Sequence, residues 1–82
     1  MQDTIHVNDP LDLGREVRRV RLSQGLTQGE LSLAAGVSRR FVVEVEGGKA
    51  TCQVGKVLHL LRMLGVRVYL EAPPEESTGS ET

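Results

Sequence analysis

Residues 27–49, TQGELSLAAGVSRRFVVEVEGGK, contain the signals of two short helices joined by a tight turn. Thr27 and Glu30 have the spacing of a capping box, in which the threonine hydroxyl accepts from the glutamate backbone N–H and the glutamate side chain accepts from the threonine N–H. Gly36 permits the left-handed backbone of a tight turn, and Ser38 is a residue type that caps the start of a helix. The pattern predicts one helix before Gly36 and another after Ser38.

These two helices, expected over residues 28–35 and 38–46, have the spacing of a helix-turn-helix. In that unit a turn containing glycine holds the second helix at about 90–120° to the first, so that its outer face can enter the major groove of DNA. The expected inward anchors are Val37, Val42 and Val45. The outer face of the second helix then carries Arg39, Arg40, Phe41 and Glu44.

Two further helices are expected around this unit. Asp9 and Pro10 are residue types that start helices, and they predict a helix over residues 10–24. Thr51 is a candidate cap for a fourth helix that ends at Gly65. The chain is therefore expected to be mainly α-helical, with four to five helices.

The fourth helix is apolar over more than one stripe. Its helically spaced apolar residues are Val54, Val57, Leu58 and Leu61, and Leu60, Met63 and Leu64 widen that surface. Such a helix needs cover on two sides, which favours a second subunit in so short a chain. Residues 66–70 alternate in polarity as a β-strand does, and a free strand edge pairs readily with its own copy. We expect a homodimer through Leu60, Met63, Val66, Val68 and Leu70.

The 82 residues are expected to form one domain with two flanking segments. Residues 1–9 are expected to be an N-terminal arm with a candidate short strand, and residues 10–70 the helix-turn-helix and dimerisation domain. Residues 71–82 are rich in proline, glutamate and serine, which predicts a disordered acidic tail.

The composition argues against several classes of function. Cys52 is the sole cysteine and His6 and His59 stand far apart, so we expect no disulfide and no metal site. The chain lacks a Ser/His/Asp or Cys/His set and a Gly-rich phosphate loop, so we expect neither catalysis nor a cofactor. We expect a cytoplasmic protein, because no apolar run approaches the ~18 residues of a membrane span and no secretory signal is visible.

The net charge of −1 conceals a segregation of charge along the chain. Residues 1–70 hold all ten basic residues against seven acidic ones, and the other four acids follow in the tail. Because DNA responds to the local field rather than to the average, the overall charge does not argue against a nucleic-acid partner.

The chain resembles the Cro/C1-type (XRE-like) helix-turn-helix repressors over about residues 13–66. The segments that carry the resemblance are Leu26-Thr27-Gln28-Gly29-Glu30-Leu31, Gly36-Val37-Ser38 and Glu46-Gly47-Gly48-Lys49. More narrowly, Leu13-Gly14-Arg15, Ser38-Arg39-Arg40-Phe41 and the apolar segment after the fourth helix look like the HipB-type antitoxins. The resemblance implies a lambda-repressor-like fold whose short C-terminal strand is exchanged across a dimer.

Physical chemistry supports several base-reading roles that the resemblance implies. Arg39 and Arg40 stand near the start of the recognition helix, where arginine donates two parallel bonds to guanine, or else they only neutralise phosphates. Phe41 either packs on a thymine methyl group or enters the core. Glu44 either accepts from the amino group of cytosine or faces solvent.

The resemblance also implies contacts with the DNA backbone and an internal ion pair. Gln28, Ser38 and Lys49 would contact phosphates, although Ser38 is also explained by capping alone. Arg21 and Glu46 match residues that pair inside the family's domain, and we assign them a structural role.

The partners implied are double-stranded DNA and a second subunit. Family repressors bind pseudo-palindromic operators with two recognition helices about 34–36 Å apart, which requires a dimer. The HipB-type resemblance further implies an antitoxin that represses its own operon and neutralises a HipA-like serine/threonine kinase. Two alternatives stay open: a stand-alone XRE-family regulator without a toxin, and a protein-interaction module that has lost DNA binding.

Overall fold

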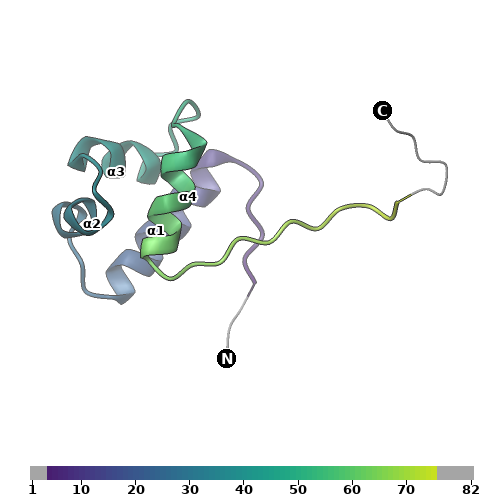
Figure 1. The fold of residues 1–82 in the computed structure, drawn as a ribbon, viewed down its shortest axis with the longest axis horizontal. Helices are drawn as coiled ribbons and strands as arrows, with labels where there is room; N and C mark the ends of the chain where they lie inside the picture. Colours follow the sequence, from purple (N-terminus) through teal and green to yellow (C-terminus); the bar gives the residue numbers. More distant parts are fainter. Residues whose placement is uncertain (1–3, 76–82) are drawn as a thin grey trace.

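The computed structural model describes residues 4–75 and contains four helices in that range. They are α1 (Pro10–Ser23), α2 (Gln28–Ala35), α3 (Arg39–Glu46) and α4 (Val54–Met63). Figure 1 shows α2 and α3 together at one end of the helical body, with an extended segment leaving α4 in the opposite direction. The prediction of a mainly helical protein built around a helix-turn-helix is confirmed.

Local capping explains where the first three helices begin. Asp9 accepts from the N–H of Asp12 at 2.8 Å, which starts α1. Thr27 and Glu30 form both bonds of the expected capping box, at 3.0 and 2.9 Å. Ser38 accepts from the N–H of Phe41 at 3.0 Å, which starts α3. Each of these bonds satisfies a backbone donor that the helix itself leaves unpaired.

The expected cap of the fourth helix is wrong. The residue before α4 is Gln53, and its side chain makes no capping bond. The first backbone bond of this helix runs from Val57 to the carbonyl of Gln53, so Thr51 lies in the loop ahead of it. A residue type suited to capping was present, but it stands two residues too early to meet a helical N–H.

The turn between α2 and α3 depends on a left-handed residue. Gly36 has a φ of 69°, a value that L side chains rarely adopt, and the next residue, Val37, donates to the carbonyl of Ser32 at 3.0 Å. Ser32 is itself buried and donates its hydroxyl to the carbonyl of Gly29. The turn therefore fixes the direction of α3 relative to α2.

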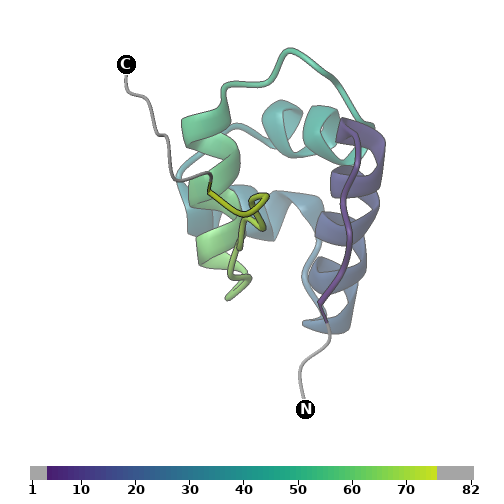
Figure 2. The ribbon, with the colours of Figure 1, turned by 90° about the vertical axis from the view of Figure 1, so that its right-hand side faces the viewer.

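All four helices contribute to a small core. Nine hydrophobic residues are buried: Val17, Leu31, Ala35, Val42, Val45, Val57, Leu60, Leu61 and Leu64. Figure 2 shows α1 and α4 on opposite sides of this core, with α3 crossing between their ends. The inner side of α3 is thereby used for packing, and its outer side is left to solvent.

The structure corrects the expected dimer surface on α4. Leu60 is fully buried in the core of its own chain, so it does not belong to a surface for a partner. Val54 and Leu58, two of the helically spaced apolar residues, are 70% and 43% exposed, and Met63 is 45% exposed. A helix that is apolar around most of its circumference has no single stripe, so periodicity alone did not identify its buried side.

Neither of the two expected strands is present within residues 4–75 of the single chain. No β-strand occurs within residues 4–75, and residues 67–75 make no backbone–backbone hydrogen bond there. Val66 packs against the core, whereas Val68 and Leu70 are 53% and 94% exposed. A strand obtains its hydrogen bonds from a neighbouring strand, and none lies beside this segment within residues 4–75. Most of the predicted acidic tail, residues 76–82, lies outside the described residues.

The close approach of α1 and α3 depends on Gly14. A Cβ atom at this buried position would lie 2.6 Å from the carbonyl oxygen of Glu46. Because the obstacle is helix backbone, Gly14→Ala is expected to lower the free energy of unfolding by about 1–3 kcal/mol. In a domain of this size each kcal/mol of lost stability lowers Tm by about 4–8 °C, a change that circular dichroism measures.

Gly55→Ala is the matched control for this prediction. Gly55 lies in α4, and an added Cβ there meets nothing within 4 Å. Alanine favours the helix over glycine, so this variant should have an unchanged or higher Tm. If Gly14→Ala were as stable as Gly55→Ala, the close contact between α1 and α3 would not contribute to stability.

Candidate nucleic-acid interface

The first turn of α3 presents two arginines to solvent. Arg39 and Arg40 are the first two residues of the helix, and both are exposed. Arg40 donates from Nε to Glu44 Oε2 over 3.1 Å. Arg39 has no hydrogen-bond or ion-pair partner in the part of the chain that the structure describes. Its five N–H donors are therefore available to an acceptor from outside the chain.

Glu44 is engaged by two cations of its own chain. Its Oε2 atom accepts from Arg40 and lies 3.3 Å from Lys49 Nζ. The hydrogen bond from Lys49 lowers the pKa of Glu44 most; desolvation opposes that shift and the bond from Arg40 adds to it. Both roles expected for Glu44, acceptance from a cytosine amino group and exposure to solvent, stay predictions, and in this structure its carboxylate is held by Arg40 and Lys49.

Phe41 occupies the edge of the core. It is half-buried and packs against the buried hydrophobic residues. Lys56 Nζ on α4 lies 5.9 Å from the centre of its ring, within the range of a cation–π interaction. Of the two roles expected for Phe41, the structure favours packing over contact with a thymine methyl group.

Two of the expected phosphate-binding residues have defined positions at helix starts. Ser38 is exposed and uses its oxygen as an acceptor for the N–H of Phe41, which leaves its O–H free to donate. Gln28 is half-buried at the start of α2, and its Nε2 donates to Glu46 Oε1 at 3.1 Å. The second N–H of this amide remains for another acceptor.

Arg21 and Glu46 form a buried ion pair that joins α1 to α3. Arg21 Nε and Nη2 donate to the two carboxylate oxygens at 2.6 and 3.0 Å, and Nη1 donates to the carbonyl of Leu26 at 2.8 Å. The two side chains are only 7% and 5% exposed. The hydrogen bond that Arg21 donates to Glu46 raises the pKa of Arg21, with desolvation opposing it, so the guanidinium stays charged throughout the accessible pH range.

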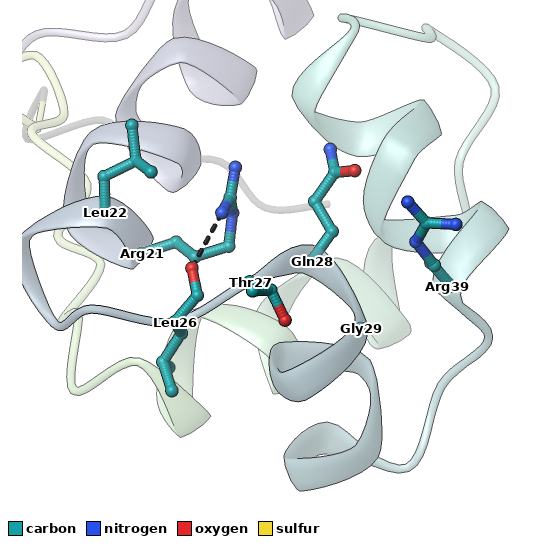
Figure 3. A pocket seen from close by; sticks show the side chains of 7 residues that line it. All are labelled: Arg21, Leu22, Leu26, Thr27, Gln28, Gly29 and Arg39. Atoms are coloured by element: carbon teal, nitrogen blue, oxygen red, sulfur yellow. Dashed lines mark hydrogen bonds between the residues drawn. The ribbon is translucent and has the colours of Figure 1, made fainter.

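An open pocket lies where the end of α1 and the starts of α2 and α3 meet (Figure 3). Its lining residues are Arg21, Leu22, Leu26, Thr27, Gln28, Gly29 and Arg39. In this view the Gln28 side chain lies between those of Arg21 and Arg39. The free N–H groups at the start of α2 and the unpaired Arg39 guanidinium suit an anion such as a phosphate group.

The described residues offer little to other chemistries. No group of three or more His, Cys, Asp or Glu side chains within residues 4–75 is placed to hold a metal ion. None of the helices in that range has the length and hydropathy of a membrane-crossing segment. Cys52 is half-buried and free.

Three contacts of this surface were not predicted from the sequence. The pair Arg40–Glu44 had a visible signal, because side chains four residues apart meet on a helix. Lys49 and Glu44 are brought together by the turn after α3, and Gln28 and Glu46 are 18 residues apart. Neither of those spacings is a local pattern, so the sequence contained no signal for them.

Comparison with known proteins agrees with this arrangement. A helix-turn-helix domain family matches residues 12–72. An uncharacterized HTH-type transcriptional regulator of Sinorhizobium fredii, y4mF, is 48% identical over 69 residues, which cover 84% of this chain and 91% of that protein. The family match over residues 12–72 includes α2, α3, α4 and all of α1 except its first two residues.

Solved structures share the fold. The HipB-O4 20mer complex matches with a TM-score of 0.77 at 20% identity and covers 87% of this chain and 100% of that chain. The restriction-modification controller protein C.AhdI from Aeromonas hydrophila matches with a TM-score of 0.65 at 29% identity and covers 72% of this chain and 86% of that chain. The chain thus belongs to the helix-turn-helix domain family, as a member of the Cro/C1-type (XRE-like) group with the fold of HipB.

Proposed function

We propose that this protein binds double-stranded DNA in a sequence-specific manner and represses transcription, with α3 as its recognition helix. The observation that carries the proposal is the exposed, unpaired Arg39 at the first residue of α3, whose inner side is fixed in the core. A base-reading side chain needs donors that are not used within the chain and a rigid element that holds it. Among the basic residues of this surface, Arg39 meets both conditions.

The size of α3 suits the major groove. An α-helix with its side chains is about 10–12 Å in diameter, and the major groove is about 12 Å wide. With the start of α3 in the groove, Arg39 would contact a guanine, and Arg40, the next residue, would lie beside it in the groove. Ser38 and Gln28 lie beside this point, and Lys49 follows the other end of α3. All three would donate to phosphates, which positions the helix without reading sequence.

Binding to a pseudo-palindromic operator would require a homodimer. The support is the exposed apolar surface beside the core: Met63 at the end of α4, and Val68 and Leu70 in the extended segment, all substantially exposed. Exposed apolar residues in an extended segment without backbone partners are suited to pair with the same segment of a second subunit. We propose that this pairing forms the strand that the single chain lacks.

Val68→Pro tests the proposed dimer. Proline removes a backbone donor and cannot continue a central strand, so this variant should be monomeric in light scattering at concentrations where the wild type is a dimer. Its helical content should be unchanged, because residue 68 lies outside the helices. A dimer that survives this substitution would exclude pairing through residues 66–70.

The proposed function itself is tested by fluorescence anisotropy. Wild-type protein is titrated with DNA from upstream of its own gene and with a scrambled duplex at about 0.15 M salt. Specific binding should exceed non-specific binding by ~10³-fold or more. Equal, weak binding to both duplexes would replace the proposal with the interaction-module alternative.

A second proposal is that this regulator is an antitoxin. The observation that favours it is the structural match, with a TM-score of 0.77 over 100% of the matched chain, to HipB in the HipA-HipB-O2-O3 complex. If a kinase-like gene neighbours this one, the two purified proteins should co-elute and the kinase should lose activity in the complex. Without complex formation, the stand-alone regulator is the remaining alternative.

A further inference from the structure

Two of the three basic residues on the proposed DNA surface, Arg40 and Lys49, share one carboxylate. Arg40 Nε and Lys49 Nζ both contact Glu44 Oε2, at 3.1 and 3.3 Å. The Glu44 side chain is 26% exposed, whereas those of Arg40 and Lys49 are 86% and 47% exposed. The three residues, which we call the Glu44 triad, therefore present one net positive charge to DNA instead of two.

The backbone holds this triad together. Arg40 precedes Glu44 by one helical turn, which places both side chains on the same side of α3. At the other end of the helix, the N–H of Lys49 donates to the carbonyl of Glu44 itself at 3.0 Å, and that of Gly48 donates to Val45. This bonding pattern ends many helices, and here it fixes the residue after the turn directly beside Glu44.

The carboxylate keeps one oxygen unused. Both cations contact Oε2, and Oε1 has no partner within residues 4–75. Binding to DNA of arbitrary sequence depends almost entirely on cations that neutralise phosphates. A carboxylate among those cations weakens such binding, because it competes with phosphates for Arg40 and Lys49 and repels the phosphates. At a matching site this loss is offset, because Oε1 can accept from a base amino group.

We propose that Glu44 is a specificity-determining residue, which suppresses binding to arbitrary DNA by holding Arg40 and Lys49. This inference rests on the proposed function and adds a division of roles to it. Arg39 reads the base sequence, and the Glu44 triad lowers the affinity for DNA that offers phosphate contacts but no matching bases. The surface would then distinguish the operator from other DNA in two ways. Arg39 favours the operator, and Glu44 disfavours DNA of arbitrary sequence.

Glu44→Gln tests the inference, since glutamine keeps the shape and an acceptor oxygen but removes the charge. Binding to scrambled DNA at about 0.15 M salt should tighten roughly 5- to 30-fold, and the slope of log K against log salt should steepen by about 1–2. Binding to the operator should change less, so that the ratio of the two affinities falls. A second substitution, Lys49→Gln in the Glu44→Gln variant, should reverse most of the gain.

Glu16→Gln is the matched control. It removes the same charge from an ion pair with Arg19 on α1, away from the triad, and should leave the ratio unchanged. If Glu44→Gln weakened operator binding and left scrambled DNA unaffected, Glu44 would be a plain base contact and the inference would be wrong. An unchanged ratio would also overturn it. Failure of the proposed function can be told apart from failure of this inference, because the wild-type protein itself would then show no preference for its operator over scrambled DNA.

Discussion

Replacing Glu46 by alanine is expected to lower the free energy of unfolding by about 3–5 kcal/mol, because it leaves the buried Arg21 guanidinium without its counter-charge. The pair is nearly excluded from solvent, and Arg21 would retain only the carbonyl of Leu26 as a partner. The raised pKa of Arg21 means that the side chain does not escape by losing its proton. A core of nine small and medium residues has little stability to spare, so the variant should be largely unfolded at 37 °C.

Urea denaturation followed by circular dichroism measures this loss. Glu16→Ala is the control, because Glu16 pairs with an Arg19 side chain that is 62% exposed, and removing such a surface pair costs about 0–1 kcal/mol. The double variant Arg21→Met/Glu46→Leu removes both charges and should regain much of the lost stability. A loss under about 1 kcal/mol for Glu46→Ala would show that the pair contributes no more than one on the surface.

Local chemistry explains why the first three helices could be predicted from the sequence. Asp9, Thr27 and Ser38 each accept from an N–H three residues later, and Gly36 takes up the left-handed turn. These interactions involve residues close in sequence, so residue types at fixed spacings identify them. The helix boundaries followed from them to within one residue for α1, α2 and α3.

Tertiary packing determines which apolar residues are buried, and the sequence alone did not predict this. Leu60 and Leu58 lie on the same apolar helix, and only the positions of α1 and α2 determine that the first is buried and the second is 43% exposed. The strand over residues 66–70 requires a partner strand, which a single sequence does not describe. Periodicity identifies apolar residues but does not assign each to a core or to an interface.

The site was predicted by residue type more successfully than by contact. The sequence placed Arg39, Arg40, Phe41 and Glu44 on the outer face of α3. In the structure both arginines are exposed and Glu44 is partly exposed, whereas Phe41 packs against the core. The sequence did not show that Arg40 is paired and Arg39 is free. Arg40 donates to Glu44, and the turn after α3 brings Lys49 to the same carboxylate, whereas Arg39 has no partner within residues 4–75. Which of the two arginines is paired with a carboxylate is therefore known only from the folded structure.

Replacing Arg39 by alanine is expected to weaken operator binding roughly 5- to 150-fold per half-site, because a bidentate contact of arginine with guanine contributes about 1–3 kcal/mol of discrimination. Binding to scrambled DNA should fall less, with a salt slope smaller by about 1, since only one positive charge is lost per subunit. The ratio of the two affinities, measured by anisotropy, is therefore the quantity that changes.

Arg39→Lys separates sequence reading from charge. Lysine keeps the positive charge but lacks the planar pair of donors that matches guanine, so it should lose specificity nearly as alanine does while binding scrambled DNA like the wild type. Arg62→Ala removes an exposed arginine from the last turn of α4 and should not alter the ratio. If Arg39→Lys kept full specificity, Arg39 would act on phosphates only. Base reading would then fall to Arg40, whose Nη1 and Nη2 make no hydrogen bond within residues 4–75 while its Nε is bound to Glu44.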